Sequence, residues 1–253
     1  MVKPRSNTFV AAERSLQTGL SRLPAWISRW FGYRKEKQMP SLSWVVCLWG
    51  LVTSFGVIAL LGYVMQLLGA FNTGFTPVPT AFAGSVILCY GAIDSPFAQP
   101  RALILGHLFS AIVGMIVYEI LIATRGWAYT SGTFWILPGL AVGVSLVVMH
   151  LTNTMHPPAG VTAVLPLMSY QMRYTGWVYL AFILLSSAVV LVVALLVNNI
   201  QRQYPLYWFA PIPRTETVLS NQHRHRTPPA ATAEETRPEP HRHHDLHDLE
   251  GGR

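Results

Sequence analysis

Residues 43–68 read SWVVCLWGLVTSFGVIALLGYVMQLL, and no side chain in this stretch carries a charge. About 20 apolar residues are enough for a helix to cross the hydrocarbon core of a bilayer. The charge-free stretch extends over residues 38–93, and two others cover residues 126–172 and 174–201. Charged residues make up 11% of the chain, against about 25% in ordinary soluble domains. The pattern excludes a soluble enzyme, a nucleic-acid binder and a disulfide scaffold, and it predicts an integral multi-pass membrane protein.

Apolar segments of two lengths divide the hydrophobic part of the chain. Four are long enough, or nearly so, to span a bilayer, with aromatic residues at their ends as at a membrane interface: Ser43–Leu68, Ala102–Ala123, Phe134–Leu151 and Trp177–Val197. Val78–Ala92 and Pro157–Met168 are shorter, and prolines stand where each begins. The sequence therefore predicts an all-α, multi-span transmembrane helix bundle with four long spans plus two short Pro/Gly-interrupted helices.

The order of these segments suggests an internal repeat. A long, a short and a long segment are followed by the same three lengths, and the short segments carry matching pairs, Ala83-Gly84 and Ala159-Gly160. With six crossings the two halves would form a 3+3 inverted repeat, an arrangement found in many secondary transporters. The alternative is that the short segments only plug the bundle, and a count of five crossings also stays open.

The chain divides into three regions by composition. Residues 1–40 form a basic arm, which the positive-inside rule places in the cytoplasm. Residues 41–202 form the transmembrane domain, and residues 203–253 form a polar tail that we expect to be disordered. Disorder is also favoured for the arm, with a short interfacial helix over Leu23–Tyr33 or a mitochondrial presequence as alternatives. The histidines of the tail lack the spacing of a structural metal site, and we expect no metal and no cofactor.

Polar residues inside the apolar segments are candidates for function because they are costly to bury there. On the second long segment His107 lies one position from a stripe of small residues, Gly106, Ser110 and Gly114, which is typical of close helix packing. A hydrogen bond across a helix interface is as good an interpretation of His107 as a contact with substrate. Asp94, Gln99 and Arg101 belong to the loop before this segment. Arg101 would supply positive charge at the cytoplasmic mouth, paired with Asp94.

The run from Thr152 to Thr162 is the strongest candidate site. Two prolines after His156 impose an extended entry and then suit the first turn of a helix. The free backbone amides at that helix start would form an anion site. Ala83, Gly84 and Ser85 offer the same device in the first half. The predicted binding residues of this run are His156, Pro157, Pro158, Ala159, Gly160 and Thr162.

These motifs resemble the HPP family of integral membrane proteins. The resemblance rests on His156-Pro157-Pro158-Ala159-Gly160, on residues 94–101 (DSPFAQPR), on Gly106-His107 and on residues 204–208 (YPLYW). Family members of photosynthetic organisms are linked to nitrite transport, so the resemblance implies a small-anion transporter. The chain departs from the family in reading Phe82-Ala83-Gly84-Ser85 where Phe-Gly-Ala-Thr is usual, which leaves the identity of the anion open.

Three functions follow as hypotheses. The first is a transporter or channel for a small inorganic anion, nitrite being the first candidate, in which His107 or His156 titrates if protons are coupled. The second is a membrane scaffold or assembly factor acting through the arm and tail. The third, a membrane-embedded enzyme, is disfavoured because the sequence contains no evident nucleophile–base pair and no HExxH metal spacing. The expected partners are the lipid bilayer and the anion but not nucleic acid. A homo-oligomer, and the choice between the plasma membrane and an organelle envelope, stay open.

Overall fold

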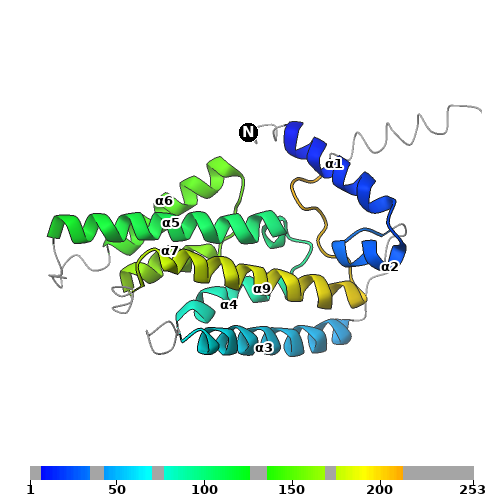
Figure 1. Ribbon diagram of the computed structural model, residues 1–253, viewed down its shortest axis with the longest axis horizontal. Helices are drawn as coiled ribbons and strands as arrows, with labels where there is room; N and C mark the ends of the chain where they lie inside the picture. Colours follow the sequence, from blue (N-terminus) through cyan, green and yellow to red (C-terminus); the bar gives the residue numbers. More distant parts are fainter. Residues whose placement is uncertain (1–6, 35–42, 70–76, 126–135, 169–174, 213–253) are drawn as a thin grey trace, which may run out of the picture. The chain divides into compact units, whose positions relative to one another are not determined.

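A computed structural model describes residues 7–34, 43–69, 77–125, 136–168 and 175–212, and these residues are all-helical, without a β-strand (Figure 1). Of residues 203–253, which the sequence predicts to be disordered, residues 203–212 are described and bonded to the rest of the fold, which corrects the prediction there; residues 213–253, and residues 1–6 of the arm, lie outside this part of the chain. The helices are α1 (Asn7–Ser21), α2 (Ala25–Ser28), η1 (Arg29–Phe31), α3 (Ser43–Leu67), α4 (Pro77–Gly91), η2 (Pro96–Ala98), α5 (Pro100–Arg125), α6 (Ile136–Thr152), α7 (Ala159–Met168) and α9 (Val178–Gln201).

Three helices are long and apolar enough to cross a membrane. They cover Trp44–Leu67, Pro100–Leu121 and Val178–Gln201 within α3, α5 and α9, as the sequence predicts. The fourth predicted span, Phe134–Leu151, corresponds to α6, which has 17 residues and is shorter than the other three. α4 and α7 are the two short apolar helices. The described residues therefore contain three helices of full spanning length, and the predicted fourth long span and 3+3 repeat are not established by them.

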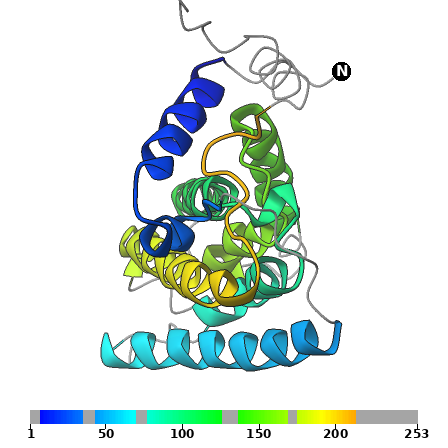
Figure 2. The same cartoon turned by 90° about the vertical axis from the view of Figure 1, so that its right-hand side faces the viewer.

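α5 lies at the centre of the helix packing. It contacts α6, α7 and α9, while α4 contacts α3, α7 and α9. α3 lies along one side of the bundle, next to α4 and α9 (Figures 1 and 2). Large apolar side chains such as Leu51 and Phe55 on α3 are exposed, and a lipid environment would cover them. α4 and α7, the two short segments, touch each other inside this arrangement.

Small residues let α5 approach α7 closely, in agreement with the predicted stripe. A Cβ added to Gly114 would lie 2.4 Å from the Ala163 oxygen, and one added to Gly106 would lie 2.7 Å from the His156 Cβ. Such distances leave no room for a side chain. The two glycines therefore set how close the α6–α7 connection and α7 come to α5.

The amino-terminal arm is helical where the sequence favoured disorder. α1, α2 and η1 occupy most of residues 7–34, and the chain after α9 (residues 203–210) runs beside them (Figure 2). We call residues 7–34 and residues 203–210 together the terminal clasp. Its short helices fall within the interfacial helix that Leu23–Tyr33 suggested.

Bonds to backbone oxygens hold the clasp to the end of α9. Arg29 donates to the carbonyls of Asn199 (2.7 Å) and Ile200 (2.6 Å), and Arg34 donates to Asn199 (2.8 Å). Cations suit this position because helix carboxyl ends carry unpaired carbonyls and partial negative charge. Burial lowers the pKa of Arg34, and the neighbouring Arg29 cation lowers it further. The two arginines cap α9.

A buried carboxylate ties the two ends of the clasp together. Glu13 on α1, only 1% exposed, accepts hydrogen bonds from the backbone amides of Trp208 (2.9 Å) and Phe209 (2.8 Å). Its other oxygen accepts from Gln17 (2.9 Å). A buried charge is tolerated only when hydrogen bonds replace its water, so Glu13 explains why α1 is bound to residues after α9.

Candidate functional site

Four polar side chains from three helices and one connection form a continuous hydrogen-bonded row, which we call the polar chain. Ser85 on α4 lies 2.7 Å from His107 Nε2 and 2.8 Å from His156 Nε2. His107 Nδ1 lies 2.7 Å from the Thr162 hydroxyl at the start of α7. His156 Nδ1 lies 2.8 Å from the carbonyl oxygen of Phe97 in η2. All four side chains are fully buried.

Local backbone features bring His156 to this place. α6 ends at Thr152, and the next residue, Asn153, adopts a left-handed conformation (φ 54°) that asparagine tolerates better than most residues. The chain then returns along α5, where Gly106 admits the His156 Cβ. Phe82 of α4 stacks on the His107 ring with centroids 4.1 Å apart. The left-handed Asn153 and the close approach at Gly106 therefore position His156, and the stacked Phe82 ring orients His107.

The start of α7 differs from the free helix end that the sequence predicts. The amides of Ala159, Gly160 and Val161 donate to the carbonyls three residues earlier, at 2.9, 3.1 and 3.2 Å. These amides are therefore occupied, because the two prolines let the chain close a tight turn before the helix. Pro157 is exposed, whereas His156 and Thr162 are buried. The motif contributes buried side chains to the polar chain in place of free backbone donors.

The hydrogen bonds of the polar chain have one consistent direction when both imidazoles are neutral. A carbonyl oxygen only accepts, so His156 carries its proton on Nδ1 and its Nε2 accepts from the Ser85 hydroxyl. Ser85 Oγ then accepts from His107 Nε2–H, and His107 Nδ1 accepts from the Thr162 hydroxyl. Every proton position thus follows from the Phe97 carbonyl at one end.

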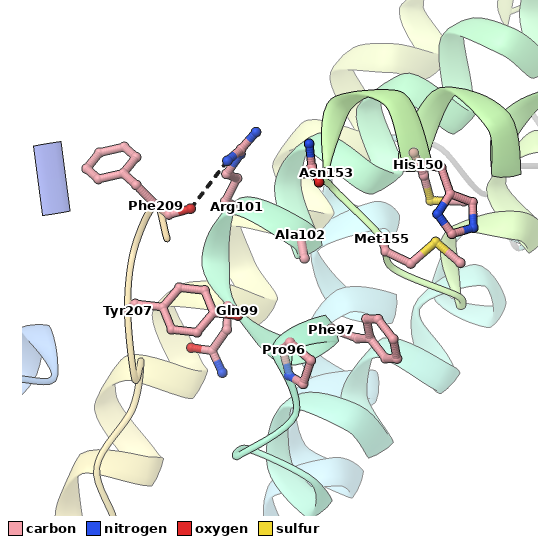
Figure 3. Close-up of a pocket in the computed structure, with 11 residues that line it drawn as sticks. Pro96, Phe97, Gln99, Arg101, Ala102, His150, Asn153, Met155, Tyr207 and Phe209 are labelled. Atoms are coloured by element: carbon pink, nitrogen blue, oxygen red, sulfur yellow. Dashed lines mark hydrogen bonds between the residues drawn. The ribbon is translucent and has the colours of Figure 1, made fainter. Parts of the chain in front are cut away.

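A pocket of about 260 Å³ lies beside this end of the polar chain. Phe97 and Met155 line it together with Arg101, His150 and Asn153 (Figure 3). The Arg101 guanidinium donates to the carbonyls of Thr152 (2.7 Å) and Phe209 (3.3 Å). It also lies 3.9 Å from the ring centroid of Phe9 on α1. Arg101 is the one permanently charged residue among those that line the pocket, which gives the pocket a positive character.

The remaining predicted residues lie around this site in supporting positions. Gln99 is buried and donates to the carbonyls of Ile93 (3.0 Å) and Ser95 (2.9 Å). Ser110 is buried on α5, whereas Asp94 and Ala83 are exposed. A Cβ added to Gly84 would lie 3.2 Å from the Pro158 side chain. The Ala-Gly pair of α4 and the prolines before α7 therefore meet, as a site shared between the short segments requires.

Two groups that bond the ends of the polar chain were not identified from the sequence. The Phe97 carbonyl and the Tyr179 hydroxyl, which donates to the Thr162 carbonyl at 2.8 Å, fix the two ends of the polar chain. The sequence also offered no evident nucleophile–base pair, yet Ser85 has two imidazoles within hydrogen-bonding distance. The signal was present as isolated polar residues on apolar helices, but their pairing depends on helix register. Among the described residues no group of His, Cys, Asp and Glu could hold a metal ion.

Comparisons with known proteins agree with this architecture. The family described as HPP, transmembrane region, matches residues 39–205. A transmembrane protein of Dictyostelium discoideum is 34% identical over 187 residues, which cover 73% of this chain and 63% of the relative. A second transmembrane protein of the same organism is 41% identical over 132 residues, covering 51% of this chain and 40% of the relative. The matches thus span less than two thirds of either relative. No solved structure matches the chain.

Proposed function

Because the chain belongs to the HPP transmembrane family, we propose that this integral membrane protein transports a small inorganic anion. Nitrite is the first candidate, since members of the family that the motifs resemble are linked to nitrite. The proposal places the anion in the pocket beside Arg101 and its path along the polar chain. It assigns the protein no enzymatic activity.

The observation that carries this proposal is a cationic pocket at the end of a buried polar row. Arg101 and the amide of Asn153 line the pocket, and they offer charge and hydrogen-bond donors to an anion. Behind the pocket wall, the polar chain runs between apolar helices. Ionisable groups buried at membrane depth are typical of substrate and proton pathways.

The proposal also includes the number of membrane crossings and the side of the membrane on which the clasp and the pocket lie. In it α6 crosses the membrane together with α3, α5 and α9, and the short helices α4 and α7 complete six crossings as a 3+3 inverted repeat. The basic arm and the clasp then lie on the cytoplasmic side, as does the Arg101 pocket. The contact between α4 and α7 supports this arrangement, because paired short helices meet at the binding site in inverted-repeat transporters.

Uptake of isotopically labelled nitrite into proteoliposomes that contain the full chain tests the proposal. We expect uptake above protein-free vesicles, with nitrate, chloride and formate as competitors. Arg101→Gln should lower uptake at least tenfold, while Arg101→Lys keeps much of it because the charge is retained. Arg22→Gln, which removes an exposed arginine of the clasp, is the matched control and should transport normally.

Other outcomes identify the alternatives. Absence of uptake for every anion would contradict the transporter and leave the scaffold hypothesis. In that case deletion of residues 213–253 should abolish function in cells, while Arg101→Gln should not. Covalent labelling of Ser85 by a fluorophosphonate would instead reveal a reactive serine. We expect no labelling, because Ser85 is fully buried between two imidazoles.

A further inference from the structure

We infer that the polar chain is a proton relay, so that the protein moves protons together with its anion. The anion half of this inference rests on the proposed function, whereas the relay itself rests on the geometry of Thr162, His107, Ser85 and His156. The relay takes up one proton at its Thr162 end and holds it on His156, next to the anion pocket.

The polar chain has two fully bonded states that differ by one proton. In the unloaded state the donors run from Thr162 through His107 and Ser85 to His156, as described above. In the loaded state His156 carries protons on both nitrogens and donates from Nε2 to Ser85. Ser85 then donates to His107 Nε2, and His107 donates from Nδ1 to the Thr162 hydroxyl. Thr162 can turn its own proton to a carbonyl of the preceding turn, a bond that threonine makes readily in helices.

The step between these states balances atom by atom. A hydronium ion gives one proton to the Thr162 oxygen and becomes water, and Thr162 passes its original proton to His107 Nδ1. His107 releases the Nε2 proton to Ser85, and Ser85 releases its hydroxyl proton to His156 Nε2. Three O–H or N–H bonds break and three form along contacts of 2.7, 2.7 and 2.8 Å. The net result is one positive charge on His156.

The chemistry of the partners separates the polar chain from ordinary packing bonds. Two other buried hydroxyls donate to backbone carbonyls, which cannot return a proton: Ser187 to Ile183, and Tyr90 to Val190. In the polar chain three consecutive contacts join side chains that both donate and accept. Only the Phe97 carbonyl is a fixed acceptor, and it closes the relay at the pocket.

The surroundings of the relay contain few competing groups. Arg101 on α5 and His150 on α6 line the pocket, and Glu119 is exposed further along α5. Three further titratable groups on the packed helices donate to backbone carbonyls: Cys89 to Ala98, Tyr90 to Val190 and Tyr179 to Thr162. Tyr118 is buried on α5. No described carboxylate is bonded to either imidazole of the relay, so an anion in the pocket would be the counter-charge of a loaded His156.

This arrangement couples the two ions. Charge on His156 increases the attraction of the pocket for an anion, and an anion in the pocket favours the loaded state by the same factor, because such coupling is reciprocal. One proton is thus bound for each monovalent anion, so that the bound pair carries no net charge. The structure therefore assigns the protein to proton-coupled, electroneutral transport of a monovalent anion.

Paired measurements on proteoliposomes test the relay. With trapped pyranine, and with valinomycin and equal potassium to hold the voltage at zero, an inward nitrite gradient should acidify the lumen by about one proton per labelled nitrite. Protein-free vesicles correct for diffusion of nitrous acid. Ser85→Ala should lower the protein-dependent proton flux at least tenfold, and Ser85→Thr should keep it because the hydroxyl remains. Ser187→Ala is the matched control, since it also removes a fully buried hydroxyl.

The outcomes separate failure of the relay from failure of the transporter. Nitrite uptake without acidification, or unchanged proton flux in Ser85→Ala, would overturn the relay and leave anion transport intact. If no anion is transported, the protonation states of His156 and His107 still decide the relay, and the nitrogen-15 measurement below reads them without an anion.

Nitrogen-15 solid-state NMR of histidine-labelled protein in bilayers gives a readout that needs no anion. At alkaline pH His156 should be an Nδ1–H tautomer and His107 an Nε2–H tautomer, assigned with His156→Gln and His107→Gln. Acidification should charge His156 and switch His107 to the Nδ1–H tautomer while it stays neutral. Independent titration of the two rings, without a tautomer change, would overturn the relay.

Discussion

The polar chain and the terminal clasp are both networks of buried hydrogen bonds, but their partners differ in kind. In the clasp, arginine, asparagine and tyrosine donors meet backbone carbonyls, as when Arg29 binds the end of α9 or Tyr204 binds the Ala98 carbonyl at 2.7 Å. Burial raises the pKa of Tyr204, so its phenol remains a donor. In the polar chain, imidazoles and hydroxyls meet one another.

This difference separates support from function. A bond between an obligate donor and an obligate acceptor has one direction, so the clasp can hold the ends of the helices but cannot change state. A bond between two groups that both donate and accept has two directions, so the polar chain can change state without moving a helix. Substitutions in the clasp should therefore alter stability, whereas substitutions in the polar chain should alter transport.

The largest expected loss of stability comes from Asn199→Leu, at the end of α9 to which the clasp is bound. The Asn199 amide donates to carbonyls that include Leu195 and Tyr204, and its oxygen accepts from the Tyr204 amide. Leucine has a similar size but cannot bond the buried amide and carbonyl of Tyr204, which costs about 3 kcal/mol for two such groups. Thermal unfolding in detergent, followed by tryptophan fluorescence, measures the effect.

A control and a second readout complete this test. Gln66→Leu replaces an exposed amide on α3 and should change the unfolding free energy by less than about 0.5 kcal/mol. Transport per folded molecule should be the same in Asn199→Leu and the unsubstituted protein. Equal stability would show that the clasp is not a support, and a loss of proton coupling would show that the two networks are not separate.

Gly106→Ala should affect both properties, because Gly106 packs directly against the polar chain. The added Cβ would lie 2.7 Å from His156 Cβ and 3.0 Å from the Thr154 oxygen. Overpacking of this kind costs about 1–3 kcal/mol, and a displaced His156 loses Ser85. We expect lower thermal stability and at least tenfold slower transport. Gly143→Ala on α6 meets no atom within 4 Å and should leave both unchanged; equal behaviour of the two variants would contradict the close packing at Gly106.

The members of the polar chain could be predicted from the sequence one at a time, but their connection could not. His107 and Ser85 are polar residues on apolar helices, and His156 and Thr162 flank a proline turn, so each is recognisable as a candidate. That both histidines bond the same hydroxyl depends on how α4 and α5 are rotated and spaced. Side-chain periodicity does not determine that rotation. The apolar helices themselves were predictable because hydrophobic length alone identifies them.

The clasp was missed for a different physical reason. Its acceptors are backbone carbonyls and its donors lie far away in sequence, so no local pattern relates Arg29 to Asn199 or Glu13 to Trp208. The arm is basic and low in overall hydrophobicity, a composition that resembles disorder, although α1 is amphipathic. Asn199 itself was a visible signal, as a polar residue in the last turns of an apolar helix. The expectation of free amides at α7 failed because closure of the turn by Pro157 and Pro158 depends on backbone conformation.

Glu13→Gln should have the smallest effect and tests the link between the two regions. The glutamine oxygen can still accept from the amides of Trp208 and Phe209, but without the charge, so the loss is about 1 kcal/mol. Because Phe209 also bonds Arg101, loosening this segment opens the pocket edge without touching the polar chain. Amide hydrogen exchange in residues 203–212 should become about fivefold faster, which corresponds to about 1 kcal/mol, while proton coupling stays at one proton per anion. Glu119→Gln, at an exposed position, is the control and should change neither the exchange rate nor the proton coupling. Unaltered exchange in Glu13→Gln would mean that the carboxylate does not hold the clasp. Altered coupling would mean that the clasp takes part in the relay.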